Sequence, residues 1–153
     1  MAAVDGLAIG IGTTMLMHCD YVVAASGATF ATPFTKLGLI PEAASSLLGP
    51  MRLGYARAFA LLVMGRSMSA EDAKASGLVN AVVDPAALET TALQAAREIA
   101  ALPTGAVALA RKLLRGNLDD LIRRVDTEAM YFRERLQSDE ARAAFAAFLA
   151  RKK

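Results

Sequence analysis

Apolar residues are distributed in two ways along the chain, with a change near residue 84. Before it, short apolar runs alternate with glycine turns, which predicts β-strands at residues 2–10, 20–26, 28–32 and 78–83. Between them we expect helices at residues 10–19, 43–48 and 54–64. Strands separated by short helices are typical of an α/β sheet with buried faces, so we predict such a segment for residues 2–83.

One helix in this part has both of its ends marked by local signals. Ser69-Ala-Glu-Asp has the S-x-x-[DE] form of a capping box, which places a helix start directly after Ser69. Gly77 suits the left-handed residue that commonly ends a helix. We therefore predict a helix between these two residues.

From Pro85 onward the pattern is helical, and Pro85 itself suits the first position of a helix. Breaks near Pro103 and Gly116 separate two helices, and two more are expected at residues 119–137 and 138–152. The last carries an apolar stripe at spacings of three and four, formed by Ala141, Ala144, Phe145, Phe148 and Leu149. This stripe predicts either a helix that faces the core or an interface between subunits.

Composition narrows the class of protein. With 153 residues, 55% of them hydrophobic, the chain is about one domain long and is more apolar than usual, which suggests surface hidden between subunits. A net charge of +2 is too small to indicate nucleic acid binding. The single Cys19 allows no disulfide within the chain, and no apolar run reaches the ~18–20 residues of a membrane span. No signal peptide or peroxisomal tripeptide is evident, so we expect a cytoplasmic protein.

Gly6-Leu-Ala-Ile-Gly10-Ile-Gly12 follows a predicted strand and opens a predicted helix. Backbone N–H groups at such a helix start can hold an anion. The segment lacks the third glycine of a dinucleotide fingerprint, because Met15 occupies that position. Either the glycines only permit tight packing, or the Ile11 N–H belongs to an oxyanion hole.

Acidic and nucleophilic candidates are few in the first 60 residues. His18 and Cys19 are adjacent on a predicted helix and point about 100° apart, so they cannot form a dyad, and we expect His18 to be structural. The only acids are Asp5, Asp20 and Glu42. Glu42 follows a proline in an apolar stretch, where it could favour the dipole of the helix at residues 43–48 or act chemically.

Three ordered motifs together resemble the crotonase superfamily, also called the enoyl-CoA hydratase/isomerase family. They are AAVDGLAIGIGTTMLMHCDYVVAA, ATFATPFTKLGLIPEAASS and GRSMSAEDAKASGLVNAVV. The resemblance implies an α/β fold with the ββα spiral core of the ClpP/crotonase type, of which residues 1–84 are the second half. Residues 85–153 would form the C-terminal helical oligomerisation region of a homotrimer or hexamer.

The resemblance covers only the second half of a usual family member. The front half would hold the first strands, the loop that binds coenzyme A and the other oxyanion amide. This agrees with a chain that opens directly on a buried-looking strand, since a central strand needs neighbours on both sides.

Departures from the family pattern indicate the type of chemistry. Family hydratases carry two glutamates that hold and activate a water, and these positions fall on Thr14 and Phe34, neither of which can accept its proton. Glu42 instead resembles the base of the peroxisomal type of Δ3,Δ2-enoyl-CoA isomerase, and Ile11 in place of the middle glycine also fits that subgroup. The resemblance therefore implies isomerase rather than hydratase chemistry.

In that chemistry Glu42 would take a proton from C2 of a 3-enoyl thioester and return it at C4, while the Ile11 N–H stabilises the enolate. The resemblance implies an acyl-CoA or enoyl-CoA substrate of fatty acid β-oxidation and no cofactor, because coenzyme A is part of the substrate. It places substrate-binding residues at Gly10, Thr14, Phe34, Phe148 and Lys152. Two alternatives remain: another reaction of coenzyme A esters on the same scaffold, and a fragment or subunit without catalysis.

Overall fold

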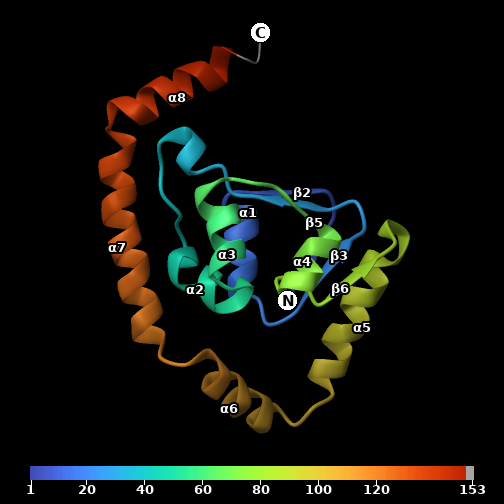
Figure 1. Cartoon of the computed structure of the whole chain (residues 1–153). Helices are drawn as coiled ribbons and strands as arrows, with labels where there is room; N and C mark the ends of the chain where they lie inside the picture. Colours follow the sequence, from blue (N-terminus) through green and yellow to red (C-terminus); the bar gives the residue numbers. More distant parts are fainter. Residues whose placement is uncertain (151–153) are drawn as a thin grey trace.

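The structure is a computed structural model that describes residues 1–150 (Figure 1). Within these residues, six short strands form two three-stranded sheets. The first sheet is parallel, with the order β1 (Ala2–Val4), β3 (Val22–Ala25), β6 (Ala81–Val83). The second has the order β2 (Leu7–Ile9), β4 (Thr29–Ala31), β5 (Met68–Ser69), and β4 pairs in parallel with β2 and antiparallel with β5. The predicted α/β segment is confirmed.

The strand that we predicted over residues 2–10 is two strands in two different sheets. The chain turns between them at Asp5–Gly6, where Gly6 has φ +84°. That conformation is easily reached by glycine and rarely by other residues. A continuous strand there was therefore a wrong prediction, because the apolar pattern is similar on both sides of the turn.

Helices cover the sheets in the N-terminal part. They are α1 (Ile11–Thr14), η1 (Met15–His18), η2 (Thr35–Leu37), α2 (Ser45–Leu53), α3 (Tyr55–Ala58), η3 (Phe59–Val63) and α4 (Ala70–Ser76). The capping prediction is confirmed, because Ser69 Oγ accepts a hydrogen bond from Asp72 N at 3.1 Å and Gly77 is left-handed. The largest side chains of the core are Phe30, Met17, Leu61 and Leu78.

Residues 85–150 form what we call the C-terminal arm. It consists of η4 (Pro85–Ala87), α5 (Leu88–Ala100), α6 (Thr104–Arg115), α7 (Leu118–Leu136) and α8 (Asp139–Ala150). In Figure 1 these helices follow one another around the outside of the sheets, with α7 along the left side and α8 at the top. Within residues 85–150, the buried residues are Leu88, Glu128 and Ala141.

The apolar stripe of the last helix is buried only at its start. Ala141 is buried, whereas Phe145, Phe148 and Leu149 are exposed. The prediction that this stripe faces the core is therefore wrong for its outer half, and the prediction of an interface stays untested. Across residues 1–150, no helix combines the length and the apolar character needed to cross a bilayer.

Candidate active site

Glu42 lies in a turn rather than at a helix start. Ala43 and Ala44 have φ of +58° and +55°, and α2 begins only at Ser45. Two consecutive alanines in the left-handed region are strained, because their Cβ atoms crowd the backbone. The prediction of a helix from residue 43, with Glu42 favouring its dipole, is thus wrong. The position of the Glu42 carboxylate must be explained by other contacts.

The side chain of Glu42 points to α1. Thr14, which is fully buried, donates a hydrogen bond from Oγ1 to Glu42 Oε1 at 2.6 Å. Glu42 itself is half-buried, and among residues 1–150 no lysine or arginine forms an ion pair with it. The carboxylate is therefore oriented by a neutral donor, with its second oxygen free of any ion pair.

His18 holds the same turn from the side of η1. Its Nε2 lies 2.6 Å from the carbonyl oxygen of Ala43, so this nitrogen carries the proton and donates it. The side chain that we expected to be structural thus bonds the backbone immediately after Glu42. Sequence reasoning did not connect the two residues, which are 24 positions apart.

The turn that leads into α1 is near the same hydroxyl, because Thr14 Oγ1 also lies 3.4 Å from Gly10 O. Gly10 precedes the helix with φ +59°, and its N–H donates to Ala31 O at 2.8 Å, which ties the turn to β4. Ile11 is the first residue of α1, so its N–H has no partner within the helix. Phe34 adjoins the turn, because a Cβ added at Gly10 would lie 3.9 Å from Phe34 Cε1.

Five of the seven predicted site residues therefore belong to one region around α1. These are Gly10, Ile11, Thr14, Phe34 and Glu42. The other two are not part of this region: Phe148 lies near the end of α8, a helix that Figure 1 draws apart from α1, and Lys152 lies outside the described residues.

Glu128 is a residue of this region that sequence reasoning missed. It comes from α7, is only 3% exposed, and accepts hydrogen bonds from Ala44 N at 2.6 Å and Ser46 N at 3.0 Å. The Ser46 hydroxyl donates to it as well, at 2.5 Å. No local signal marked Glu128, since it is one of many charged residues along that helix and its partners are more than 80 positions away.

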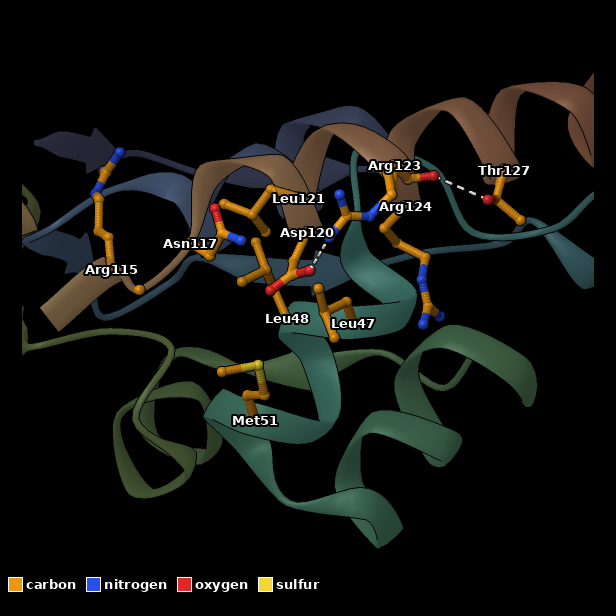
Figure 2. A pocket seen from close by; sticks show the side chains of 11 residues that line it. Leu47, Leu48, Met51, Arg115, Asn117, Asp120, Leu121, Arg123, Arg124 and Thr127 are labelled. Atoms are coloured by element: carbon orange, nitrogen blue, oxygen red, sulfur yellow. Dashed lines mark hydrogen bonds and ion pairs between the residues drawn. The ribbon is translucent and has the colours of Figure 1, made fainter. Parts of the chain in front are cut away.

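A hollow of about 540 Å³ lies between α2 and the α6–α7 part of the arm (Figure 2). Its apolar side is formed by Leu47, Leu48 and Met51 of α2. Its three arginines already have partners: Arg115 pairs with Asp20, Arg123 with Asp120, and Arg124 with the Ser46 hydroxyl. Glu42 and Thr14 do not line this hollow, so it is separate from the candidate site.

Asp20 attaches the arm to the junction of η1 and β3. Its carboxylate pairs with Arg111 at 2.8 Å and with Arg115 at 2.9 Å. Partial burial raises the pKa of Asp20, but the hydrogen bonds and charges of the two arginines outweigh it and hold the pKa below its usual range. This carboxylate therefore anchors the arm to the first region of the chain.

The region around α1 thus places the half-buried carboxylate of Glu42 beside Thr14 on an α/β scaffold. Among residues 1–150, no three potential metal-ligating side chains form a group. The sequence matches the enoyl-CoA hydratase/isomerase family over residues 1–153, and the chain belongs to this family.

Several members of the family resemble the chain over nearly its whole length. The 1,2-epoxyphenylacetyl-CoA isomerase of Escherichia coli (strain K12) is 37% identical, over 99% of this chain and 58% of that protein. Enoyl-CoA delta isomerase 2 of Rattus norvegicus is 36% identical, over 99% of this chain and 39% of that protein. A crystal structure of an enoyl-CoA hydratase/isomerase from Pseudoalteromonas atlantica T6c has a TM-score of 0.92 and 41% identity, over 95% of this chain and 59% of that chain. The chain thus spans about 39–59% of the length of these relatives.

Proposed function

We propose that the protein is a Δ3,Δ2-enoyl-CoA isomerase in which Glu42 is the only general base. The observation that carries this proposal is the hydrogen bond from Thr14 to the Glu42 carboxylate at 2.6 Å. Thr14 is the last residue of the short helix α1, and its Oγ1 also lies 3.4 Å from Gly10 O. The carboxylate is therefore near the turn whose Ile11 N–H would face the thioester oxygen. The similarity to an enoyl-CoA delta isomerase supports the same reaction.

The proposed reaction uses the carboxylate twice. The Glu42 oxygen that Thr14 does not engage takes a proton from C2 of the substrate, and the electrons of that C–H bond form the enolate. The N–H of Ile11 donates to the enolate oxygen where negative charge develops. The double bond then moves from C3–C4 to C2–C3 as the protonated Glu42 returns the proton to C4, which regenerates the carboxylate.

The residues around Glu42 support isomerisation over hydration. Hydration would need a second acid to hold and activate water, and the two positions where family hydratases carry glutamates are here Thr14 and Phe34. Both are buried, and the Thr14 hydroxyl is occupied by Glu42. The aromatic ring of Phe34 beside Gly10 would exclude water from the same surface.

Substrate, partners and assembly belong to the same proposal. The substrate would be an enoyl-CoA thioester, with Gly10, Thr14 and Phe34 near the acyl part and Phe148 and Lys152 near the nucleotide. Coenzyme A is part of this substrate, so the reaction needs no cofactor. The exposed apolar side chains of the arm fit packing between copies in a homotrimer or hexamer.

A second candidate is another isomerisation of a coenzyme A ester on the same site. The observation that favours it is the 37% identity to a 1,2-epoxyphenylacetyl-CoA isomerase. Both reactions could use one carboxylate and one oxyanion site. Turnover of a 3-enoyl-CoA and of an epoxide thioester by the same preparation distinguishes the two.

The test of the proposed function is the Glu42→Gln variant, which keeps the shape of the side chain but removes the base. General-base catalysis contributes roughly 10²–10⁴ in rate, so kcat for 3-enoyl-CoA isomerisation should fall by that factor. Glu71→Gln, at an exposed position in the first turn of α4, is the matched control and should retain the parent kcat. Equal turnover by Glu42→Gln and the parent would remove Glu42 from the mechanism.

A further inference from the structure

We propose that Glu128 is a positioning residue for Glu42. From α7 it holds the left-handed Ala43–Ala44 turn, and this turn sets where the Glu42 carboxylate lies. The inference rests on the proposed function for its kinetic test. It assigns to the C-terminal arm a part in the geometry of the site.

Three donors surround the carboxylate of Glu128. Its Oε2 accepts from Ala44 N at 2.6 Å, and its Oε1 accepts from Ser46 N and from the Ser46 hydroxyl. Both oxygens are thus used, and the residue is almost completely buried. A buried carboxylate is costly unless donors satisfy it, and here two of the three donors are backbone N–H groups, one in the turn (Ala44) and one in the first turn of α2 (Ser46). Arg124 extends the network by donating to Ser46 Oγ at 3.1 Å.

The Ala43–Ala44 turn that Glu128 contacts is strained. Ala43 and Ala44 both lie in the left-handed region, which alanine adopts only when surrounding contacts enforce it. Glu128 bonds the N–H of Ala44 on one side, while His18 bonds the carbonyl of Ala43 on the other. These two side chains therefore help to hold the backbone in this conformation, together with the N–H groups of Leu47 and Leu48, which donate to Ala44 O.

The Ala43–Ala44 turn is directly connected to Glu42. Glu42 directly precedes Ala43, and its carbonyl accepts from Ser45 N at 3.1 Å, so the turn closes on Glu42 itself. Rotation of Ala43 or Ala44 toward an ordinary conformation would move the Glu42 side chain away from Thr14. A misplacement of about 1 Å in an active site can cost about 10²-fold in rate.

Glu128→Gln tests the inference because an amide cannot reproduce these contacts. Glutamine has one acceptor oxygen, so its NH₂ group must face the N–H of either Ala44 or Ser46. We expect kcat to fall by about 10–100-fold with KM within about threefold of the parent. The matched control is Glu134→Gln, an exposed position on the same helix, which should leave kcat unchanged.

A double-mutant cycle separates positioning from mere stabilisation. If Glu128 acts through Glu42, then adding Glu128→Gln to Glu42→Gln should cost less than about twofold in kcat, because the base is already gone. Both rates are measured well below the thermal midpoint of each variant, which we expect to fall by roughly 3–10 °C for Glu128→Gln. A loss of kcat of the same size with and without Glu42, or a lower midpoint with an unchanged kcat, would overturn the inference.

A readout without turnover keeps this inference separate from the proposed function. If the parent does not isomerise a 3-enoyl-CoA, the proposed function fails, and the position of Glu42 is then read from the ¹³C signal of its side-chain carboxyl, assigned with Glu42→Gln. We expect Glu128→Gln to shift that signal and Glu134→Gln to leave it in place. An unchanged Glu42 signal in Glu128→Gln would refute the positioning role.

Discussion

Residues 1–84 contain a core of buried large apolar side chains, although others such as Leu7 and Met51 are exposed, whereas in residues 85–150 Leu88 is the large apolar side chain that is buried. Phe30 and Met17 are fully buried in the first region, while Leu113 and Leu114 of α6 are 82% and 89% exposed. Burial of apolar area is the main stabilising term for a folded domain. The first region can therefore be stabilised by its own core, whereas the arm is held by its contacts with the first region.

Two small apolar clusters, around Leu88 and around Ala141, attach the arm to the first region together with polar contacts. Two of the polar contacts lie on residues 38–46, the segment that contains Glu42. At one end of this segment Arg135 Nε donates to Gly38 O at 3.1 Å. At the other end Glu128 bonds Ala44 and Ser46. The comparison shows that an arm with little buried apolar surface of its own still bonds the backbone next to Glu42.

The largest effect on stability should come from the core of the first region. Phe30→Ala should lower the free energy of unfolding by about 3–5 kcal/mol, because Phe30 is completely buried. Leu114→Ala, in the exposed part of the arm, should change it by less than about 0.5 kcal/mol at low protein concentration. Chemical denaturation of both variants gives the comparison.

The same pair also tests the proposed oligomer. If copies of the chain pack through the arm, the effect of Leu114→Ala should grow with protein concentration, since association stabilises the folded state by mass action. Equal and concentration-independent losses in the two variants would contradict the contrast between a packed region and an exposed arm.

A smaller effect is expected at Gly38, the residue after η2, where α8 packs closely against the backbone. A Cβ at Gly38 would lie 2.7 Å from Ala141 N and 2.8 Å from Ala141 Cα, and Gly38 has φ +71°. Gly38→Ala should therefore destabilise the protein by about 2–4 kcal/mol, from the clash and the strained backbone together. Thermal and chemical unfolding measure this loss.

Gly116→Ala is the control for that variant, because Gly116 has φ +68° but nothing within 4 Å of an added Cβ. It should show only the backbone term of about 1–2 kcal/mol. If the two variants lose the same stability, the close contact between Gly38 and α8 does not contribute.

The smallest effect concerns the ion pairs of Asp20. Because Arg111 and Arg115 hold its pKa below the ordinary value of 3.8 in the folded state, the pairs stabilise the protein above that value. The stabilisation is lost as the pH falls through the lower pKa of the folded state. Asp20→Asn should cost less than about 1 kcal/mol at neutral pH, since these pairs are exposed to water.

Thermal midpoints of the parent and Asp20→Asn across pH 7 to about 2 measure this term. The difference between them should shrink as the parent Asp20 becomes protonated. A difference that stays constant over this range would show that the carboxylate charge does not attach the arm.

Local sequence signals predicted local structure well. The Ser69 cap and the left-handed Gly77 were both correct, because a capping box and a terminal glycine depend on neighbouring residues only. The resemblance to known motifs also brought Gly10, Thr14, Phe34 and Glu42 into one site, since each belongs to an ordered motif.

Features that depend on distant partners were missed. The start of α2 was placed too early because Ala43 and Ala44 form a left-handed turn that bonds the distant His18 and Glu128, and no pattern near residue 43 indicates these partners. The stripe on α8 was ambiguous for a related reason. Its periodicity is the same whether the apolar face meets the core or another molecule, and only Ala141 meets the core.

The central claim is that one carboxylate, Glu42, removes the C2 proton of the substrate. It is tested most directly by following a 3-enoyl-CoA deuterated at C2 with NMR, in the presence of the intact protein or its Glu42→Gln variant. The account predicts that the parent removes one deuteron from C2 and forms a 2-enoyl-CoA, while both deuterons stay in place with Glu42→Gln. Loss of deuterium at the same rate with both proteins, or a 3-hydroxyacyl-CoA as the main product of the parent, would contradict it.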